Sequence, residues 1–206
     1  MSLAADRPAD GAREARLAIE AWAYKGFQRQ HYNFVLAQVQ TALYEGNAST
    51  AWQTISENWP LMKRTFLLRV PQFRIESAYL RARSALQRAQ RERQAGPFLS
   101  VVKRDIRQLQ HEHLAWPRVV ATLLAAGVEF REGRPDVAAR GLEAAADGFL
   151  RADMHLYVAA ARWRLGALLG GARGRDLQQS ADDWMAAQQI RNRPAMVRLL
   201  APGLPD

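Results

Sequence analysis

The chain has 206 residues, a formal net charge of +9 and no cysteine. The lack of cysteine excludes disulfides, thiol nucleophiles and cysteine zinc sites, and it predicts a reducing, cytoplasmic compartment. No apolar run approaches the roughly 20 residues that a membrane-spanning helix needs, so we expect no membrane insertion. A chain of this length buries roughly 70% of its unfolded surface, which is enough for one domain with its own core.

Alanine, leucine, glutamine and arginine dominate the chain, and all four favour helices. No stretch alternates between apolar and polar residues with a period of two, so strands are not expected. We therefore predict an all-α protein with more than about 65% helix, against an ordinary third. Proline and glycine separate the expected helices, which are, in chain order, 12–28, 31–45, 48–58, 61–69, 72–94, 98–114, 117–132, 135–150, 154–169, 176–189 and 194–200.

The N-terminal stretch "MSLAADRPADGAR" lacks the apolar core of a secretory signal. We expect residues 1–13 to be a disordered lead-in or an expression remnant. Residues 14–203 are expected to form a single helical-repeat domain.

Two stretches, "YEGNASTAWQTI" and "REGRPDVAARGL", repeat the same spacing. In each, a glycine is followed five residues later by alanine and nine residues later by an aliphatic residue. Glycine is expected where the backbone reverses tightly, and alanine where the second helix crosses close to the first. The residues are Gly46, Ala51 and Ile55 in the first joint, and Gly133, Ala138 and Leu142 in the second.

This spacing resembles the second half of a tetratricopeptide (TPR) motif. The first half is present in degenerate form. "LLAAGVEFREG" places Gly127 and Phe130 where the motif has glycine and tyrosine, but the run to Gly133 is one residue short. "WRLGALLGG" has the motif spacing, but "ARGRD" is expected to delay the next helix. The resemblance implies a right-handed α-solenoid, in which hairpins of helices stack.

A second resemblance covers residues 30–203. "WPLMKRTFLLRVPQFRIESAYLRARSAL" and "SADDWMAAQQIRNRPAMVRLLAPGL" look like the C-terminal helical region of large bacterial serine/threonine kinases, of the kind abundant in myxobacteria. The resemblance implies a sensing or scaffolding role beside an upstream kinase. The chain itself has no glycine-rich loop after a strand, no His-Arg-Asp and no Asp-Phe-Gly.

The basic residues gather in one part of the chain. Between Lys63 and Arg107 there are twelve basic and three acidic residues, a surplus equal to the whole net charge. Arg74, Arg81 and Arg88 are spaced by seven and are predicted to form a positive line along one helix. Arginine grips carboxylate or phosphate in two places, so this line is a candidate anion-binding ridge; a solvated face without a partner is the alternative. Arg69 extends the line.

Candidates for catalysis or metal binding are few. His111 and His113 are two residues apart, roughly 200° around a helix, and so cannot share a metal. Carboxylates and histidines are not clustered, and "GGARGRD" lacks the ending of a phosphate loop. Most of the tryptophans are expected in the core, whereas Trp116, just before Pro117, is expected to be more exposed.

The sequence therefore predicts a non-catalytic interaction or sensor module without cofactor or metal. The partner is a protein, helix or peptide, with an acidic protein or the parent kinase domain as candidates, bound in a groove or on the basic ridge. The candidate partner-binding residues are Arg69, Arg74, Arg81, Arg88 and Trp116. Nucleic-acid binding through the arginines of 63–107 is the alternative function, and an enzyme with an unfamiliar site is a second one.

Overall fold

The computed structural model describes residues 2–23 and 26–205. Helices take up 78% of the chain, and no strand occurs among the residues described. The prediction of an all-α protein is confirmed. None of the helices in these residues combines the length and the apolar composition that crossing a membrane requires.

Ten α-helices and one 3₁₀ turn follow one another in the described chain. They are α1 (Pro8–Glu20), α2 (Arg29–Tyr44), α3 (Ala48–Arg64), the 3₁₀ turn η1 (Phe66–Arg69), α4 (Pro71–Ala89), α5 (Gly96–Gln110), α6 (Ala115–Arg131), α7 (Pro135–Arg151), α8 (His155–Leu169), α9 (Gly171–Ala187) and α10 (Arg193–Leu200).

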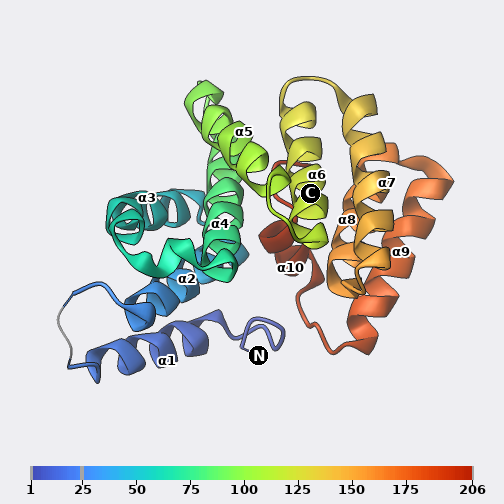
Figure 1. The fold of residues 1–206 in the computed structure, drawn as a ribbon. Helices are drawn as coiled ribbons and strands as arrows, with labels where there is room; N and C mark the ends of the chain where they lie inside the picture. The colour runs from blue at the N-terminus through green and yellow to red at the C-terminus, as the bar shows by residue number, and fades with distance from the viewer. Residues whose placement is uncertain (1, 24–25, 206) are drawn as a thin grey trace.

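Each helix from α1 to α9 packs against the next one in the chain, as in a helical-repeat array (Figure 1). The ribbon divides into two groups, α1 to α5 on one side and α6 to α9 on the other. The last helix, α10, departs from this order, because it turns back between the two groups and contacts α2 and α8. It thus packs between early and late helices of the array.

The two repeated joints have the same backbone geometry, as predicted. Gly46 and Gly133 both adopt the left-handed conformation, with φ of 75° and 78°. After each glycine, the next amide donates to the carbonyl five residues earlier, at 2.8 Å from Asn47 and 2.9 Å from Arg134. This pattern is the Schellman motif, which satisfies carbonyls at a helix end. Ala51 and Ala138, five residues on, are fully buried.

Two further joints make the same turn without glycine. Asp153 and Gln189 have φ of 57° and 60°, and the residues after them donate to carbonyls five residues earlier. The glycine spacing did not indicate this equivalence, because these joints have no glycine. Asp tolerates the left-handed conformation as a single residue. The joint is therefore more regular in structure than in sequence.

Three expected boundaries are wrong. Pro60 does not break a helix: α3 continues through it to Arg64, and only a 3₁₀ turn follows. "ARGRD" does not delay the ninth helix, which begins at Gly171, directly after Gly170 with φ of 61°. Helix α1 begins at Pro8 rather than at residue 12, because proline fits a first helical turn, and it ends at Glu20.

Part of the expected lead-in is in contact with the rest of the molecule. Leu3 packs against the core, and Asp6 accepts a hydrogen bond of 2.9 Å from the hydroxyl of Tyr44. The amide of Arg191 donates to the carbonyl of Ala4. Met1, Tyr24 and Lys25, which fall in the expected lead-in and first helix, lie outside the described residues, as does Asp206.

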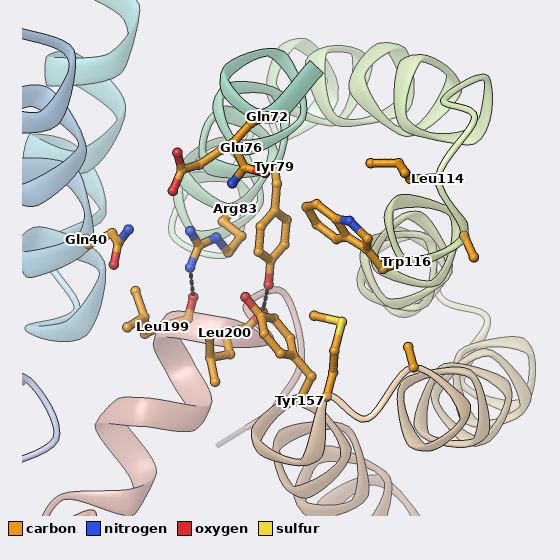
Figure 2. Close-up of a pocket in the computed structure, with 13 residues that line it drawn as sticks. Gln40, Gln72, Glu76, Tyr79, Arg83, Leu114, Trp116, Tyr157, Leu199 and Leu200 are labelled. Atoms are coloured by element: carbon orange, nitrogen blue, oxygen red, sulfur yellow. Dashed lines mark hydrogen bonds between the residues drawn. The ribbon is translucent and has the colours of Figure 1, made fainter. Parts of the chain in front are cut away.

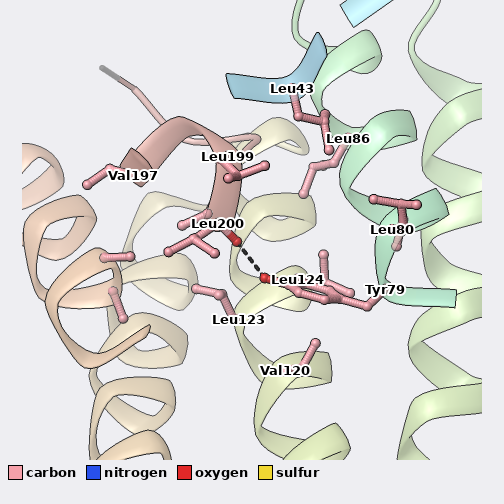
Figure 3. Close-up of a cluster of buried hydrophobic side chains, with 14 of the residues drawn as sticks. Leu43, Tyr79, Leu80, Leu86, Val120, Leu123, Leu124, Val197, Leu199 and Leu200 are labelled. Carbon is pink, nitrogen blue, oxygen red and sulfur yellow. Dashed lines mark hydrogen bonds between the residues drawn. The ribbon is translucent and has the colours of Figure 1, made fainter. Parts of the chain in front are cut away.

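The C-terminal end of α10 completes the core where the two groups of helices meet (Figure 3). Leu199 and Leu200 are 4% and 6% exposed and lie among leucines of α4 and α6. The segment after α10 is also buried, and its carbonyls accept hydrogen bonds from Gln90 and Arg164. This arrangement leaves open spaces beside α10, of which the one with aromatic walls lies between α4, α6 and α8.

Candidate functional site

A pocket of about 550 Å³ lies between the two groups of helices, beside the end of α10 (Figure 2). Its walls come from α2, α4, α6, α8 and α10 and from the turns before α6 and α8. The lining residues are Gln40, Gln72, Glu76, Tyr79, Arg83, Leu114, Ala115, Trp116, Ala152, Met154, Tyr157, Leu199 and Leu200. Elements that are far apart in the chain therefore build one site.

The floor of the pocket is held by Tyr79 and Arg83 of α4, one helical turn apart. The hydroxyl of Tyr79 donates to the carbonyl of Leu200 at 2.8 Å, and the guanidinium of Arg83 donates to the carbonyl of Leu199 at 3.0 Å. The guanidinium also lies 4.1 Å from the centre of the Tyr79 ring, in a cation–π contact. Burial raises the pKa of Tyr79 well above its ordinary value, so the hydroxyl remains protonated.

Arg83 is a buried cation without a carboxylate partner. It is 4% exposed, and within residues 2–23 and 26–205 it makes no ion pair. Its Nε has no hydrogen-bond acceptor in the same residues. A buried charge is normally paired, so Arg83 gives the pocket an unmatched positive charge.

Glu76, on the same helix as Arg83, gives the pocket a negative charge. It precedes Arg83 by seven residues, two turns of α4 and about 10 Å along the helix axis. Its carboxylate accepts a hydrogen bond of 2.8 Å from the hydroxyl of Tyr32, which holds it in place. The two charges sum to zero, and the amides of Gln40 and Gln72 add uncharged hydrogen-bonding groups.

The remaining surface of the pocket is apolar. Trp116, near the start of α6, faces Tyr79 across the opening, and Tyr157 lies on the lower side in Figure 2. Met154, just before α8, also lines the pocket. Trp116 is half-buried, but so are the other five tryptophans, so the expected contrast between an exposed Trp116 and tryptophans in the core is wrong. Aromatic walls with a few fixed polar groups are typical of ligand-binding pockets.

The predicted line of arginines does not form a solvated ridge. Arg81 is 5% exposed and donates two hydrogen bonds to Asp105 of α5, one of them at 2.8 Å. Its guanidinium also lies 3.4 Å from the ring centre of Trp59. Burial raises the pKa of Asp105, and the Arg81 hydrogen bonds oppose that rise. The spacing of seven does place the arginines on one side of α4, but that side faces α5.

The other arginines of the line also have acidic partners. Arg74 binds both carboxylate oxygens of Glu112 at 2.7 Å, and this pair lowers the pKa of Glu112. Arg88 pairs with Glu92 on its own helix. Arg69 alone of the four candidates is exposed and, among the residues described, unpaired.

The structure brings only one of the five predicted site residues, Trp116, into the pocket. Tyr79 and Arg83 were not among the predicted site residues. The four-residue spacing of this pair was the available signal, because it places both side chains on one helix face. No local signal links them to Tyr157, whose position depends on how α8 packs.

Comparisons with known proteins identify no relative: no family model, curated protein or solved structure matches the chain significantly.

Proposed function

We propose that the chain is a non-catalytic binding module, and that its partner is a protein or peptide whose apolar side chains enter the pocket beside α10. The observation that carries the proposal is the pocket itself, about 550 Å³ in volume and walled by Tyr79, Trp116 and Tyr157. Pockets between about 300 and 1,000 Å³ with aromatic walls suit bulky side chains and small ligands. Helical arrays commonly bind partners in this way, and on that point the proposal is an analogy of fold.

The chemistry of the pocket favours binding over catalysis. Its most buried hydroxyl, that of Tyr79, already donates to a backbone carbonyl and is hard to ionise. Glu76 accepts a hydrogen bond from the hydroxyl of Tyr32 on one carboxylate oxygen, and its other oxygen can accept one from a ligand. These groups orient a ligand by hydrogen bonds and shape, which is the role of a recognition site.

The arrangement of the arginines supports a protein partner over nucleic acid. Binding along a phosphate backbone uses many exposed cations. Among the arginines of 63–107, Arg81 and Arg83 are buried, and Arg74 and Arg88 are paired with carboxylates. The six exposed ones do not line the pocket; they are Arg64, Arg69, Arg91, Arg93, Arg104 and Arg107. The proposed module would serve as a cytoplasmic sensing or scaffolding part of a bacterial signalling kinase, a context that rests on the sequence resemblance alone.

The test is selection from a phage-displayed library of random dodecapeptides on the folded protein. We expect a family of peptides with a shared bulky apolar residue. Trp116→Ala removes one wall of the pocket and is expected to weaken their binding at least about tenfold, a typical effect of removing an aromatic anchor contact. Trp184→Ala, on α9 away from the pocket, is the matched control and should change the affinity little.

Both variants are first checked for native far-ultraviolet circular dichroism and cooperative unfolding. The proposal is wrong if selection yields no binders, or if Trp116→Ala and Trp184→Ala bind the selected peptides as the unaltered protein does.

A further inference from the structure

Residues 61–70, which comprise the last turn of α3 and the link through η1 to α4, expose apolar side chains that would ordinarily be buried. Phe66 is 73% exposed, and Leu61 and Val70 are each 45% exposed. We call residues 61–70 the rim segment. Single exposed apolar residues are common on protein surfaces, but three within one short segment mark a candidate contact surface.

The rim segment also concentrates unpaired positive charge. Lys63, Arg64 and Arg69 are exposed, and none makes an ion pair with any described residue. The sequence has no acidic residue between Glu57 and Glu76. The guanidinium of Arg69 lies 4.5 Å from the centre of the Phe66 ring, so charge and apolar surface share one site.

The segment is fixed in position by its own hydrogen bonds. The hydroxyl of Thr65 donates to the carbonyl of Met62 at 2.8 Å, and the amide of Val70 donates to that of Leu67 at 3.0 Å. Arg74 donates to the carbonyl of Arg69 at 3.2 Å while it binds a carboxylate of the α5–α6 turn. The exposure of Phe66 is therefore not a consequence of a loosely held chain.

The same Arg74 joins the rim segment to the mouth of the pocket. The carboxylate that Arg74 binds belongs to Glu112. Two residues later, Leu114 is 47% exposed and lines the pocket. On the other side, the rim segment runs directly into Gln72, another lining residue. A ligand that fills the pocket and extends past this edge therefore reaches the end of the rim segment that Arg74 holds, at Leu68 and Arg69. Leu61, at the other end, lines a separate pocket.

We infer that the partner is a protein segment in which a bulky apolar anchor residue is flanked by aspartate or glutamate. This inference rests on the proposed function of the pocket. The charges of Glu76 and Arg83 cancel within the pocket, so the three cations of the rim segment set its preference for charge. Complementary charges at the edge of an interface raise the association rate and select the partner.

Features of the rim segment favour such a peptide over nucleic acid. Leu61 and Val70 offer aliphatic surface, which suits apolar side chains, whereas single-stranded nucleic acid binds by stacking bases on aromatic rings along a basic groove. The only ring in the rim segment, Phe66, has the guanidinium of Arg69 close to it. The pocket beyond the edge is net neutral.

The test uses the peptides selected on the pocket and two triple variants of equal net charge. The rim variant is Lys63→Gln, Arg64→Gln, Arg69→Gln. The control variant is Arg140→Gln, Arg151→Gln, Arg175→Gln, which removes three exposed arginines of α7 and α9 that do not line the pocket. Both variants lose three positive charges. A difference in their peptide affinity therefore reflects where the removed charges lie, and not the net charge of the protein.

We expect the selected peptides to be enriched in acidic residues beside the anchor. The rim variant should bind them about tenfold more weakly at about 50 mM salt, as expected for three exposed ion pairs, while the control variant stays within about twofold. The loss should shrink towards about 300 mM salt, because exposed charges are screened. Replacing the acidic residues of the peptide by their amides should have the same effect as the rim variant.

Three results would overturn this inference and leave the pocket proposal intact, provided that Trp116→Ala still weakens binding. One is a set of selected peptides without acidic enrichment. Another is equal affinity for the rim and control variants across the salt range. The third is a rim variant that loses binding to single-stranded oligo-dT but keeps its affinity for the peptides, which would assign the rim segment to nucleic acid.

Discussion

The contact between α4 and α5 differs in kind from the packing of α6 to α9. Across the first contact, Arg81 of α4 and Asp105 of α5 form a buried ion pair, and Arg74 near the start of α4 binds Glu112 just after the end of α5. In α6 to α9 the close contacts are made by glycine. A Cβ on Gly148 would lie 2.7 Å from Val119, and one on Gly166 would lie 2.5 Å from the carbonyl of Gly174. The α4–α5 contact thus contains a buried ion pair, whereas glycines allow a close approach at the α6–α7 and α8–α9 contacts.

The largest effect is expected at the polar contact. Arg81→Gln leaves the carboxylate of Asp105, which is 0% exposed, without its cation. Breaking a buried pair on one side typically costs about 3–5 kcal/mol, so the free energy of unfolding should fall by this amount in urea denaturation. The exposed Arg107→Gln on the same contact helix is the control. Similar midpoints for the two variants would show that the pair does not support the α4–α5 contact.

This expectation replaces one that the sequence alone suggests. If Arg74, Arg81 and Arg88 were a solvated line, glutamine at all three positions would leave stability nearly unchanged. The seven-residue spacing is compatible with both situations. Whether the arginines are solvated or paired depends on how α5 packs against α4. Asp105, the partner of Arg81, lies 24 residues later in the chain and on another helix.

A second prediction compares the two repeated joints, one in each half. Ala51→Leu and Ala138→Leu each place a large side chain at a fully buried helix crossing. Overpacking of this kind costs about 1–3 kcal/mol, and because both joints have the same turn geometry the two losses should be similar. Thermal and urea unfolding measure both. A wild-type midpoint for either variant would break the equivalence of the joints.

A third prediction tests the glycine contact between α8 and α9. Gly166→Ala puts its Cβ against the backbone of Gly174, so one helix must shift, at a cost of about 1–3 kcal/mol. Gly96→Ala is the control, because nothing lies within 4 Å of a Cβ there. That change should be neutral or slightly stabilising, since alanine reduces the freedom of the unfolded chain. Equal stability of the two variants would mean that α8 and α9 do not need their close approach.

The smallest effect is a pH dependence at the Arg74–Glu112 pair. The pKa of Glu112 lies below its ordinary value of 4.5 in the folded protein, because Arg74 donates to its carboxylate. The pair therefore stabilises the fold fully above about pH 4.5, and the contribution is lost as the pH falls through the lowered pKa. Arg74 is one-third exposed, so the contribution is about 1 kcal/mol.

Unfolding free energies of the unaltered protein and of Glu112→Gln should differ at pH 7, and the difference should shrink as the pH falls below about 4.5, the ordinary pKa of the carboxyl. A difference that stays constant over this range would assign the effect of Glu112 to packing and not to charge.

The fold was more predictable from sequence than the site. Helices followed from composition and spacing, and the two glycine joints followed from Gly46 and Gly133, because those features act locally along the chain. The predicted helix break at Pro60 was wrong, because α3 continues through this proline to Arg64. The pocket was missed because Tyr79 and Tyr157 meet only through the placement of α8 and α10, which no local pattern of residues encodes.

The most direct test of the proposed function is fluorine NMR of the protein labelled with 5-fluorotryptophan, titrated with a peptide selected on it. Each tryptophan gives its own resonance, and Trp116→Phe assigns the one that lines the pocket. We predict that the Trp116 resonance shifts in proportion to the bound fraction while that of Trp184 stays in place. A saturable shift of Trp184, with Trp116 unmoved, would show that the partner binds elsewhere and would contradict the account.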